Sequence, residues 1–208
     1  MSNELSNFGD AASASVTRGA QHAETFGIHG VYHVVCRDSD GNVKWEDTAP
    51  NLVTAVGKQA LFDYFFGATG TAGGTASGAN YLGLCGGTAT YAYDNTMSVA
   101  SRAWTEVGGA TAPIYSGNRQ SINWTAASSG VLASPNNITT KTGGAITFSI
   151  VTTGGTVNGC FIVGGAGATA TKGDTTGILY SCGNFTGGSK TVAPGDSLAV
   201  TYSTTATG

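Results

Sequence analysis

Short stretches in which apolar and polar residues alternate recur along most of the chain, and glycine-rich turns separate them. This pattern is typical of antiparallel strands that have one buried face and one solvated face. The predicted strands lie at Val31–Cys36, Val43–Asp47, Tyr81–Cys85, Trp104–Val107, Gln120–Ala126, Ala145–Thr152, Val157–Val163, Gly177–Cys182 and Ser197–Ser203. Together they predict a mainly β protein, an antiparallel β-sandwich or jelly-roll.

The segment DSDGN, Asp38–Asn42, joins the first two of these strands. Its Asp-Gly pair favours a tight hairpin turn, because glycine readily adopts the positive φ that such turns need. A calcium-binding EF-hand loop begins similarly, but it needs Gly at its sixth position and Glu at its twelfth. Here Gly41 is fourth and Ala49 is twelfth, so we interpret the segment as a hairpin turn.

One segment has helical rather than alternating spacing. Its apolar residues recur near a helical period, which predicts one substantial helix over Leu52–Phe66; they are Leu52, Val53, Val56, Ala60, Leu61, Tyr64 and Phe65. A helical turn is also expected over Thr96–Arg102. We hypothesise that the hairpin and the long helix form a folding nucleus, with the helix covering one end or face of the sandwich.

Residues 1–25 show neither period, and their apolar residues stand singly among small ones. Two interpretations stay open: a disordered terminus, or an extended arm that becomes ordered against a neighbouring subunit. Residues 26–208 then form the sandwich domain. The arm interpretation assigns the contacts with a neighbour to Leu5, Phe8, Val16, Arg18 and Phe26.

The composition predicts a folded chain with an unusual surface. The 208 residues are 40% hydrophobic but only 10% charged, with a formal net charge of −3, whereas ordinary domains are about 25% charged. The surface must therefore consist largely of Thr, Ser, Asn and Gly. Such a surface suits a protein that is partly buried in an assembly, or one that works outside a cell.

The sequence also argues against nucleic acid and against a membrane as partners. The nine basic residues are spread singly, whereas a nucleic-acid surface needs clustered Lys and Arg. No apolar stretch approaches the length of a transmembrane helix. The first 26 residues contain three acidic residues and no continuous apolar core, so no signal peptide is expected.

The residues that usually carry chemistry are scattered. The four cysteines form no CxxC pair, and we interpret them as buried free thiols, with one or two disulfides as the alternative; they are Cys36, Cys85, Cys160 and Cys182. His29 and His33 share a strand face but lie well apart, which indicates a solvated face rather than a metal site. The segment GAGATA at Gly165–Ala170 fits a dinucleotide fingerprint, but a turn rather than a helix follows it. We therefore expect no cofactor.

Several blocks resemble a family of tailed-bacteriophage proteins that are often encoded beside the major capsid protein. The family pairs a CxDxDGxxKW hairpin with an NLVxxxG segment, both found within Tyr32–Phe66. Further similar blocks are YLGLC, NTMSVASRAWTEV, IYSGNRQSINW and GILYSCGNFTGGSKTVAPGDSLAVTYS, so the resemblance covers most of the chain from Tyr32 onward. The family's AGDTM reads YDNTM here. The resemblance implies a β-rich structural protein of the virion and supplies no catalytic residues.

The expected function is therefore that of a capsid decoration, or cement, protein that binds the outside of the major capsid protein shell and stabilises the head. Its expected partners are the major capsid protein and copies of itself, as a dimer or trimer, with no nucleic acid and no membrane. Synthesis is expected in the host bacterial cytoplasm, followed by location on the capsid surface. The alternative is a head-fibre, tail or host-adsorption component that binds cell-surface glycans. A glycan hydrolase would need two acidic residues across a cleft, and no sequence pattern indicates such a pair.

Overall fold

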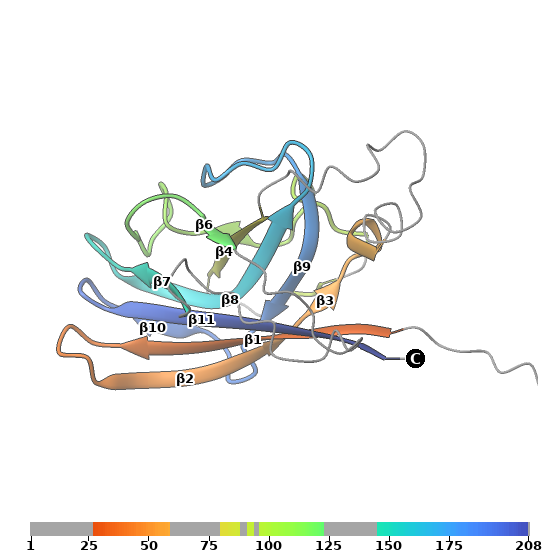
Figure 1. Cartoon of the computed structure of the whole chain (residues 1–208). Helices are drawn as coiled ribbons and strands as arrows, with labels where there is room; N and C mark the ends of the chain where they lie inside the picture. Colours follow the sequence, from red (N-terminus) through yellow and green to blue (C-terminus); the bar gives the residue numbers. More distant parts are fainter. Residues whose placement is uncertain (1–26, 59–79, 88–90, 94–95, 123–144, 208) are drawn as a thin grey trace, which may run out of the picture.

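The computed structural model describes residues 27–58, 80–87, 91–93, 96–122 and 145–207. These residues form two antiparallel sheets that pack face to face (Figure 1). The strands are β1 (Gly27–Arg37), β2 (Val43–Pro50), β3 (Leu52–Val53), β4 (Asn80–Gly86), β5 (Thr105–Glu106), β6 (Gln120–Ile122), β7 (Ile146–Ser149), β8 (Gly155–Gly164), β9 (Ile178–Asn184), β10 (Lys190–Val192) and β11 (Ser197–Thr207). The mainly β, antiparallel prediction is confirmed.

The smaller sheet has the order β2-β1-β11-β7, and the larger sheet has β3-β9-β8-β4-β5, with β6 paired to β4 and β10 to β8. The β1–β2 hairpin closes at the predicted turn. There the Asp38 carboxylate accepts hydrogen bonds from the Asp40 and Asn42 backbone N–H groups, at 3.0 and 2.8 Å. Gly41 supplies the expected positive φ of 88°.

The main core lies between the two sheets. Alternate side chains of β1, β7 and β11 point inward, and they meet the inward side chains of β4 and β8. The inward residues of β1, β7 and β11 are apolar, which is the alternation that the sequence predicts. Tyr32 and Tyr202 stack across β1 and β11 with ring centroids 4.8 Å apart.

The larger sheet is covered on its second face as well. A second cluster there is built on Phe161, with Trp104 and Leu179 beside it. Glycine at position 83 makes room for this arrangement, because a Cβ on Gly83 would overlap the Phe161 ring. Burial on both faces explains why every residue of β8 from Val157 to Gly164 is buried.

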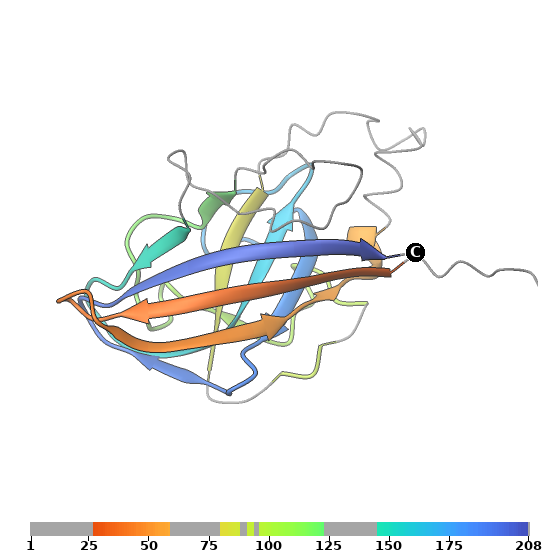
Figure 2. The same cartoon turned by 60° about the horizontal axis from the view of Figure 1, so that its bottom comes forward.

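The second face of the smaller sheet has no such cover among the described residues. Figure 2 turns this face toward the reader. We call it the outer face. Its side chains alternate with the buried ones and include those of His29, Val31, His33, Val35 and Arg37 of β1, Glu46 and Thr48 of β2, Ser197, Ala199 and Thr201 of β11, and Thr147 and Ser149 of β7.

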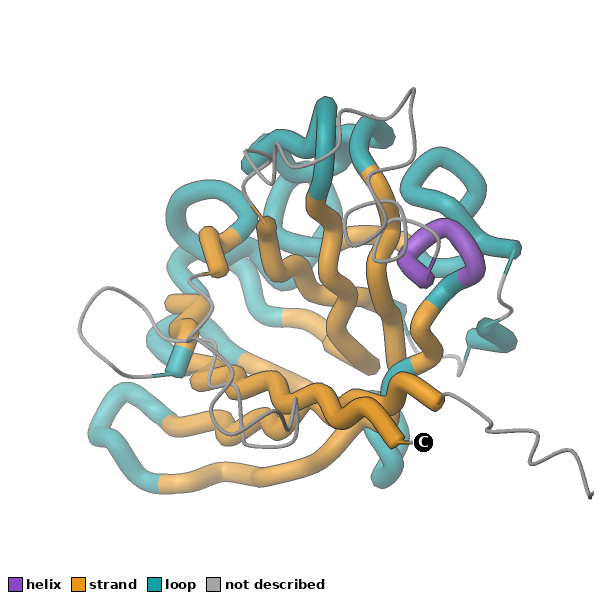
Figure 3. Tube along the Cα trace, turned by 45° about the vertical axis from the view of Figure 1, so that its right-hand side comes forward, coloured by secondary structure: helices purple, strands orange, loops and turns teal. Residues whose placement is uncertain are grey.

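The predicted helix over Leu52–Phe66 is not confirmed. Leu52 and Val53 form β3 instead, because they pair with Cys182 and Ser181 at the edge of the larger sheet. One helical turn follows at residues 55–58, shown in purple in Figure 3. Thr54 begins this turn: its hydroxyl accepts from the Gly57 N–H at 3.1 Å and donates to the Leu179 carbonyl at 2.5 Å. Residues 59–66 lie outside the described residues.

Two further predictions need comment. Thr96–Arg102 forms bends rather than a helical turn, because Ser98 closes a short loop with Ser101 through both backbone and hydroxyl hydrogen bonds. The jelly-roll connectivity is not confirmed. The predicted arm, residues 1–25, lies outside the described part of the chain, as do residues 123–126 of the strand predicted at Gln120–Ala126.

The β9–β10 loop covers part of the free edge of β2. The Asp47 carboxylate accepts from the Thr186 hydroxyl at 2.6 Å and the Gly187 N–H at 2.9 Å, and it pairs with the Lys190 ammonium at 2.8 Å. The Thr186 N–H donates to the Thr48 carbonyl at 2.7 Å. These contacts occupy strand-edge groups that would otherwise be open to pairing with another chain.

We expect the Asp47→Asn variant to lose less stability than the wild-type protein when the pH is lowered into the acid range. Burial opposes ionisation of Asp47, but hydrogen bonds from Lys190, Thr186 and the backbone outweigh it and lower its pKa from 3.8 to about 2. A lowered pKa stabilises the fold above pH 4, and this contribution is lost as the pH falls from about 4 to about 2. Removing it should cost about 1–2 kcal/mol at pH 7 and little at pH 2.

Urea unfolding between pH 7 and pH 2 measures this effect. Asp40→Asn makes the same change of net charge on the exposed hairpin turn and serves as the control. If the free energy of unfolding falls with decreasing pH in the same way in both variants, the Asp47 contacts do not stabilise the loop.

Candidate functional site

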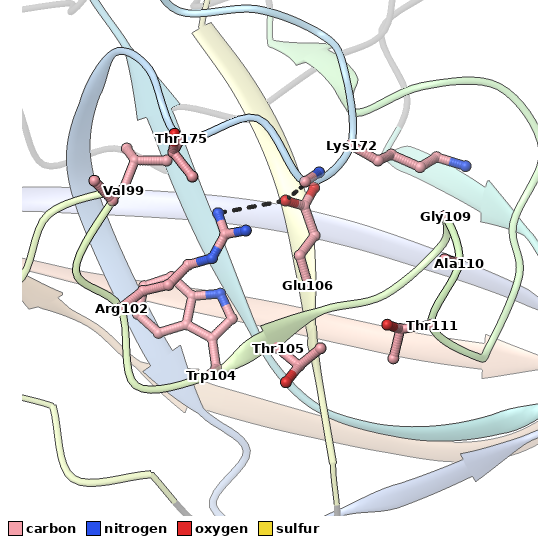
Figure 4. A pocket seen from close by; sticks show the side chains of 12 residues that line it. Val99, Arg102, Trp104, Thr105, Glu106, Gly109, Ala110, Thr111, Lys172 and Thr175 are labelled. Carbon is pink, nitrogen blue, oxygen red and sulfur yellow. Dashed lines mark hydrogen bonds and ion pairs between the residues drawn. The ribbon is translucent and has the colours of Figure 1, made fainter.

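A cluster of charged side chains lies where β5, the segment before β6 and the β8–β9 loop, residues 165–177, come together (Figure 4). At its centre, Arg119 and Glu106 form a bidentate pair. Arg119 Nε donates to Glu106 Oε1 at 2.8 Å, and Nη2 donates to Oε2 at 2.7 Å. The exposed fractions of the two side chains are 0% and 2%, so this ion pair is buried.

The remaining donors of Arg119 hold the β8–β9 loop. Nη2 donates to the Asp174 carbonyl at 2.6 Å and Nη1 to the Thr169 carbonyl at 3.3 Å. The loop contacts Glu106 as well, through the Gly173 N–H at 2.9 Å from Oε2. The guanidinium also lies over the Phe161 ring, 5.5 Å from its centroid. Arg119 therefore links the second core cluster to the loop above it.

Two further cations flank this pair. Arg102 Nη1 lies 3.5 Å from Glu106 Oε2, and Figure 4 shows its guanidinium directed at that carboxylate. Lys172 points the other way and donates to the carbonyls of Gly108 and Tyr115, at 2.6 and 2.7 Å. Burial lowers the pKa of Lys172, while the Glu106 carboxylate opposes that shift.

Asp174 organises the loop from within. Hydrogen bonds from the Thr176 hydroxyl, the Thr176 backbone and the Thr169 hydroxyl lower its pKa to about 2. The two hydroxyl contacts are each 2.7 Å long. The loop is therefore closed by its own polar side chains as well as by Arg119.

A pocket of about 500 Å³ lies beside the cluster, lined by Arg102, Trp104, Glu106, Lys172 and Thr175 among others. Both Glu106 oxygens already accept hydrogen bonds from Arg119, and Lys172 is engaged by two carbonyls. A general acid or base must reach a substrate proton, and these groups are committed to the protein instead. The geometry supports a structural cross-link.

The two described histidines, His29 and His33, and the four cysteines take no part in the contacts of this site. His33 pairs with Glu46 on the outer face, at 2.8 Å. All four cysteines are buried thiols that form no disulfide, as the buried-thiol interpretation predicts. Burial raises the pKa of Cys36 to about 11 and raises that of Cys160 further. Among the described residues, no group of three or more His, Cys, Asp or Glu is placed to hold a metal ion.

The predicted contact residues are not placed by this structure: Leu5, Phe8, Val16, Arg18 and Phe26 all lie outside the described residues. Trp104 is buried in the second core cluster, and the partly buried Trp45 packs against the main core. The GAGATA segment belongs to the β8–β9 loop, and no helix follows it. None of the helices in the described ranges has the length and apolar character that crossing a bilayer requires.

Comparison of the chain with protein-family models, with curated proteins and with solved structures finds no match.

Proposed function

We propose that this protein is a structural component of a tailed-bacteriophage virion, a capsid decoration protein that binds the outside of the head. The sequence blocks from Tyr32 onward carry the resemblance on which this proposal rests. Its expected partners are the major capsid protein and further copies of the chain. No catalytic step and no cofactor form part of the proposal.

The structural observation that best supports it is the long β1–β11 ribbon. Gly27 pairs with Thr207 and Arg37 with Ser197, so the two strands run side by side over eleven residues. Gly27 therefore lies beside the C-terminal strand at one end of the smaller sheet (Figure 1). The 26 residues that precede it join the sandwich at this end, where they can reach roughly 85 Å if fully extended. That reach is enough for an arm to contact a neighbouring subunit.

The distribution of charge also supports a structural role. Charged side chains such as Lys44, Lys190 and Arg119 are paired with carboxylates within the fold, which leaves Thr-rich faces outside. Interface cores are depleted of charge in the same way. When many copies bind one shell, their individually modest contacts would together give firm attachment.

A cryo-EM reconstruction of purified virions tests the proposal. We expect density for the sandwich across the icosahedral shell, with residues 1–25 lying over neighbouring coat subunits. A chain that lacks residues 1–25 should bind assembled capsids more weakly in co-sedimentation, and neither form should bind free coat subunits. Density confined to the tail or to fibres at one vertex would instead support the glycan-binding adsorption component.

A further inference from the structure

The pocket beside the Glu106–Arg119 pair contains polar groups that the fold leaves unused. Its volume of about 500 Å³ lies within the range of small-molecule sites, about 300–1,000 Å³. Figure 4 shows Arg102 and Trp104 on one side of it and Thr111 on the other, with Glu106 between them. Glu106 and Arg119 satisfy each other, so a ligand would have to be held by the other side chains.

Arg102 is the least committed of the three cations in this cluster. Its Nη1 lies 3.4 Å from the Asp174 carbonyl and 3.5 Å from Glu106 Oε2, both longer than an ordinary bond of about 2.9 Å. Its Nε and Nη2 have no hydrogen-bond partner among the described residues. Glu106 already accepts from Arg119 and from the Gly173 N–H. The Arg102 guanidinium is therefore free to form the two parallel hydrogen bonds that a carboxylate accepts.

A second donor lies beside this guanidinium. The Trp104 side chain is 3% exposed, and its indole N–H has no acceptor within the part of the chain that the structure describes. Trp45, by contrast, donates its N–H to the Thr191 carbonyl at 3.2 Å. Figure 4 shows the nitrogen edge of the Trp104 ring turned toward the Arg102 guanidinium. The N–H is closed off from solvent, so a ligand oxygen reaches it through a side-chain shift, which the long contacts of Arg102 permit.

The local charge favours an anion in the pocket. Arg102, Arg119 and Lys172 are three cations, whereas Glu106 and Asp174 supply only two carboxylates, which leaves one positive charge in excess. A buried donor and an uncompensated guanidinium are both satisfied by an oxygen that carries negative charge.

The rest of the lining favours hydroxyl groups on the same ligand. Thr105, Thr111 and Thr175 are exposed and line the pocket. A threonine hydroxyl both donates and accepts, so it can pair with a sugar hydroxyl in either direction. A carboxylate and several hydroxyls on one small molecule are the chemistry of a sugar acid.

We propose that this pocket binds a sugar acid. Arg102 holds the carboxylate, the Trp104 N–H donates to one of its oxygens, and the three threonine hydroxyls contact the hydroxyls of the ring. A ligand of this size binds with a Kd of about 1 mM at ordinary ligand efficiency. The inference goes beyond the proposed function and does not depend on capsid binding.

Nuclear magnetic resonance of the full-length, ¹⁵N-labelled protein tests this inference with D-glucuronate as the probe. The chain has three tryptophans and therefore three indole N–H signals, and Trp104→Phe identifies the one at the pocket. That signal should move saturably with a midpoint of about 1 mM. The Trp45 signal should stay in place, and neither D-glucose nor matched sodium chloride should move the Trp104 signal.

Arg102→Met should weaken glucuronate binding at least about tenfold, because the charged donors to the carboxylate are lost. Arg102→Lys keeps the charge without the fork and should also bind more weakly. Arg37→Met is the matched control, since Arg37 lies on the β1–β2 hairpin and donates to the Gly41 carbonyl there. Circular dichroism melting should show that all three variants fold.

Three results would contradict the inference. A Trp104 signal that does not move saturably, or equal glucuronate binding by wild-type protein and both Arg102 variants, would overturn the site. Acetate that binds as tightly as glucuronate would overturn the assignment to a sugar acid, because the hydroxyl contacts would then add nothing.

Discussion

Arg119→Met should lower the free energy of unfolding by about 3–5 kcal/mol, which is the usual cost of removing one partner of a buried ion pair. The methionine retains much of the volume of the arginine stem but leaves Glu106 buried without its bidentate partner. It also removes the donors to the Asp174 and Thr169 carbonyls, so the β8–β9 loop loses its anchor. The loss should be measured by urea unfolding at pH 7.

A double-mutant cycle separates the pair from its surroundings. Glu106→Gln together with Arg119→Met removes both charges of the bidentate pair and leaves only Arg102 without its carboxylate, so the double variant should lose less than the sum of the two single variants. Lys190→Met is the matched control for a less buried pair and should cost about 1 kcal/mol or less. Similar losses in Arg119→Met and Lys190→Met would show that burial adds nothing to the Arg119 link.

Hydrogen exchange gives a second, local measurement of the same change. In Arg119→Met, protection should fall first at the amides of residues 165–177, including Gly173, whose N–H donates to Glu106. Protection in the β1–β2 hairpin, which has no contact with this cluster, should change only with global stability. Uniform loss of protection would indicate that Arg119 supports the whole sandwich rather than the loop.

The strands were predictable because most of them have one wet face. In β7 the buried Ile146 and Phe148 alternate with the exposed Thr147 and Ser149, and the period of two is visible in the letters. Glycine-rich turns then marked the ends. The short strands β3 and β10 were missed, since two or three residues carry no period and their pairing depends on β9 and β8.

The helix prediction failed at its beginning for a related reason. Leu52 and Val53 fit a helical stripe as well as they fit a strand, and local spacing cannot distinguish the two over so few residues. Pairing with Ser181 and Cys182, more than 120 residues away in the sequence, decides the outcome. The Thr54 hydroxyl accepts a hydrogen bond from the Gly57 N–H, and the helical turn begins only at Ala55. The arm prediction stays a prediction, because residues 1–25 are outside the described structure.

The Glu106–Arg119 cluster had no sequence signature. The two residues are thirteen positions apart, and they meet because β5 and β6, the strand that follows Arg119, both pair with β4. One signal was available: in a chain with 10% charged residues, Glu106 stands between Trp104 and Val107 in a predicted strand. A charge in an apolar strand needs a buried partner. Which of the nine basic residues supplies it depends on tertiary structure alone.

Phe161→Ala should destabilise the protein by about 3–5 kcal/mol, the usual range for removing a large aromatic side chain from a core. Phe161 is fully buried on β8, and its ring packs 5.5 Å from the Trp104 ring centroid and beneath the Arg119 guanidinium. Gly83 lies against the ring and has no side chain that could fill the space. The cavity therefore cannot collapse from that side, and the loss should fall in the upper half of the range.

Phe161→Leu restores much of the missing volume and should cost less than half as much as the alanine variant. Because the cluster supports Arg119 from below, Phe161→Ala and Arg119→Met should be less than additive when combined. Near-ultraviolet circular dichroism should lose part of its aromatic signal in the alanine variant, since Trp104 loses its packing partner. Strict additivity of the two losses would mean that the second core cluster and the loop anchor stabilise the sandwich independently, and that the cation–π contact does not couple them.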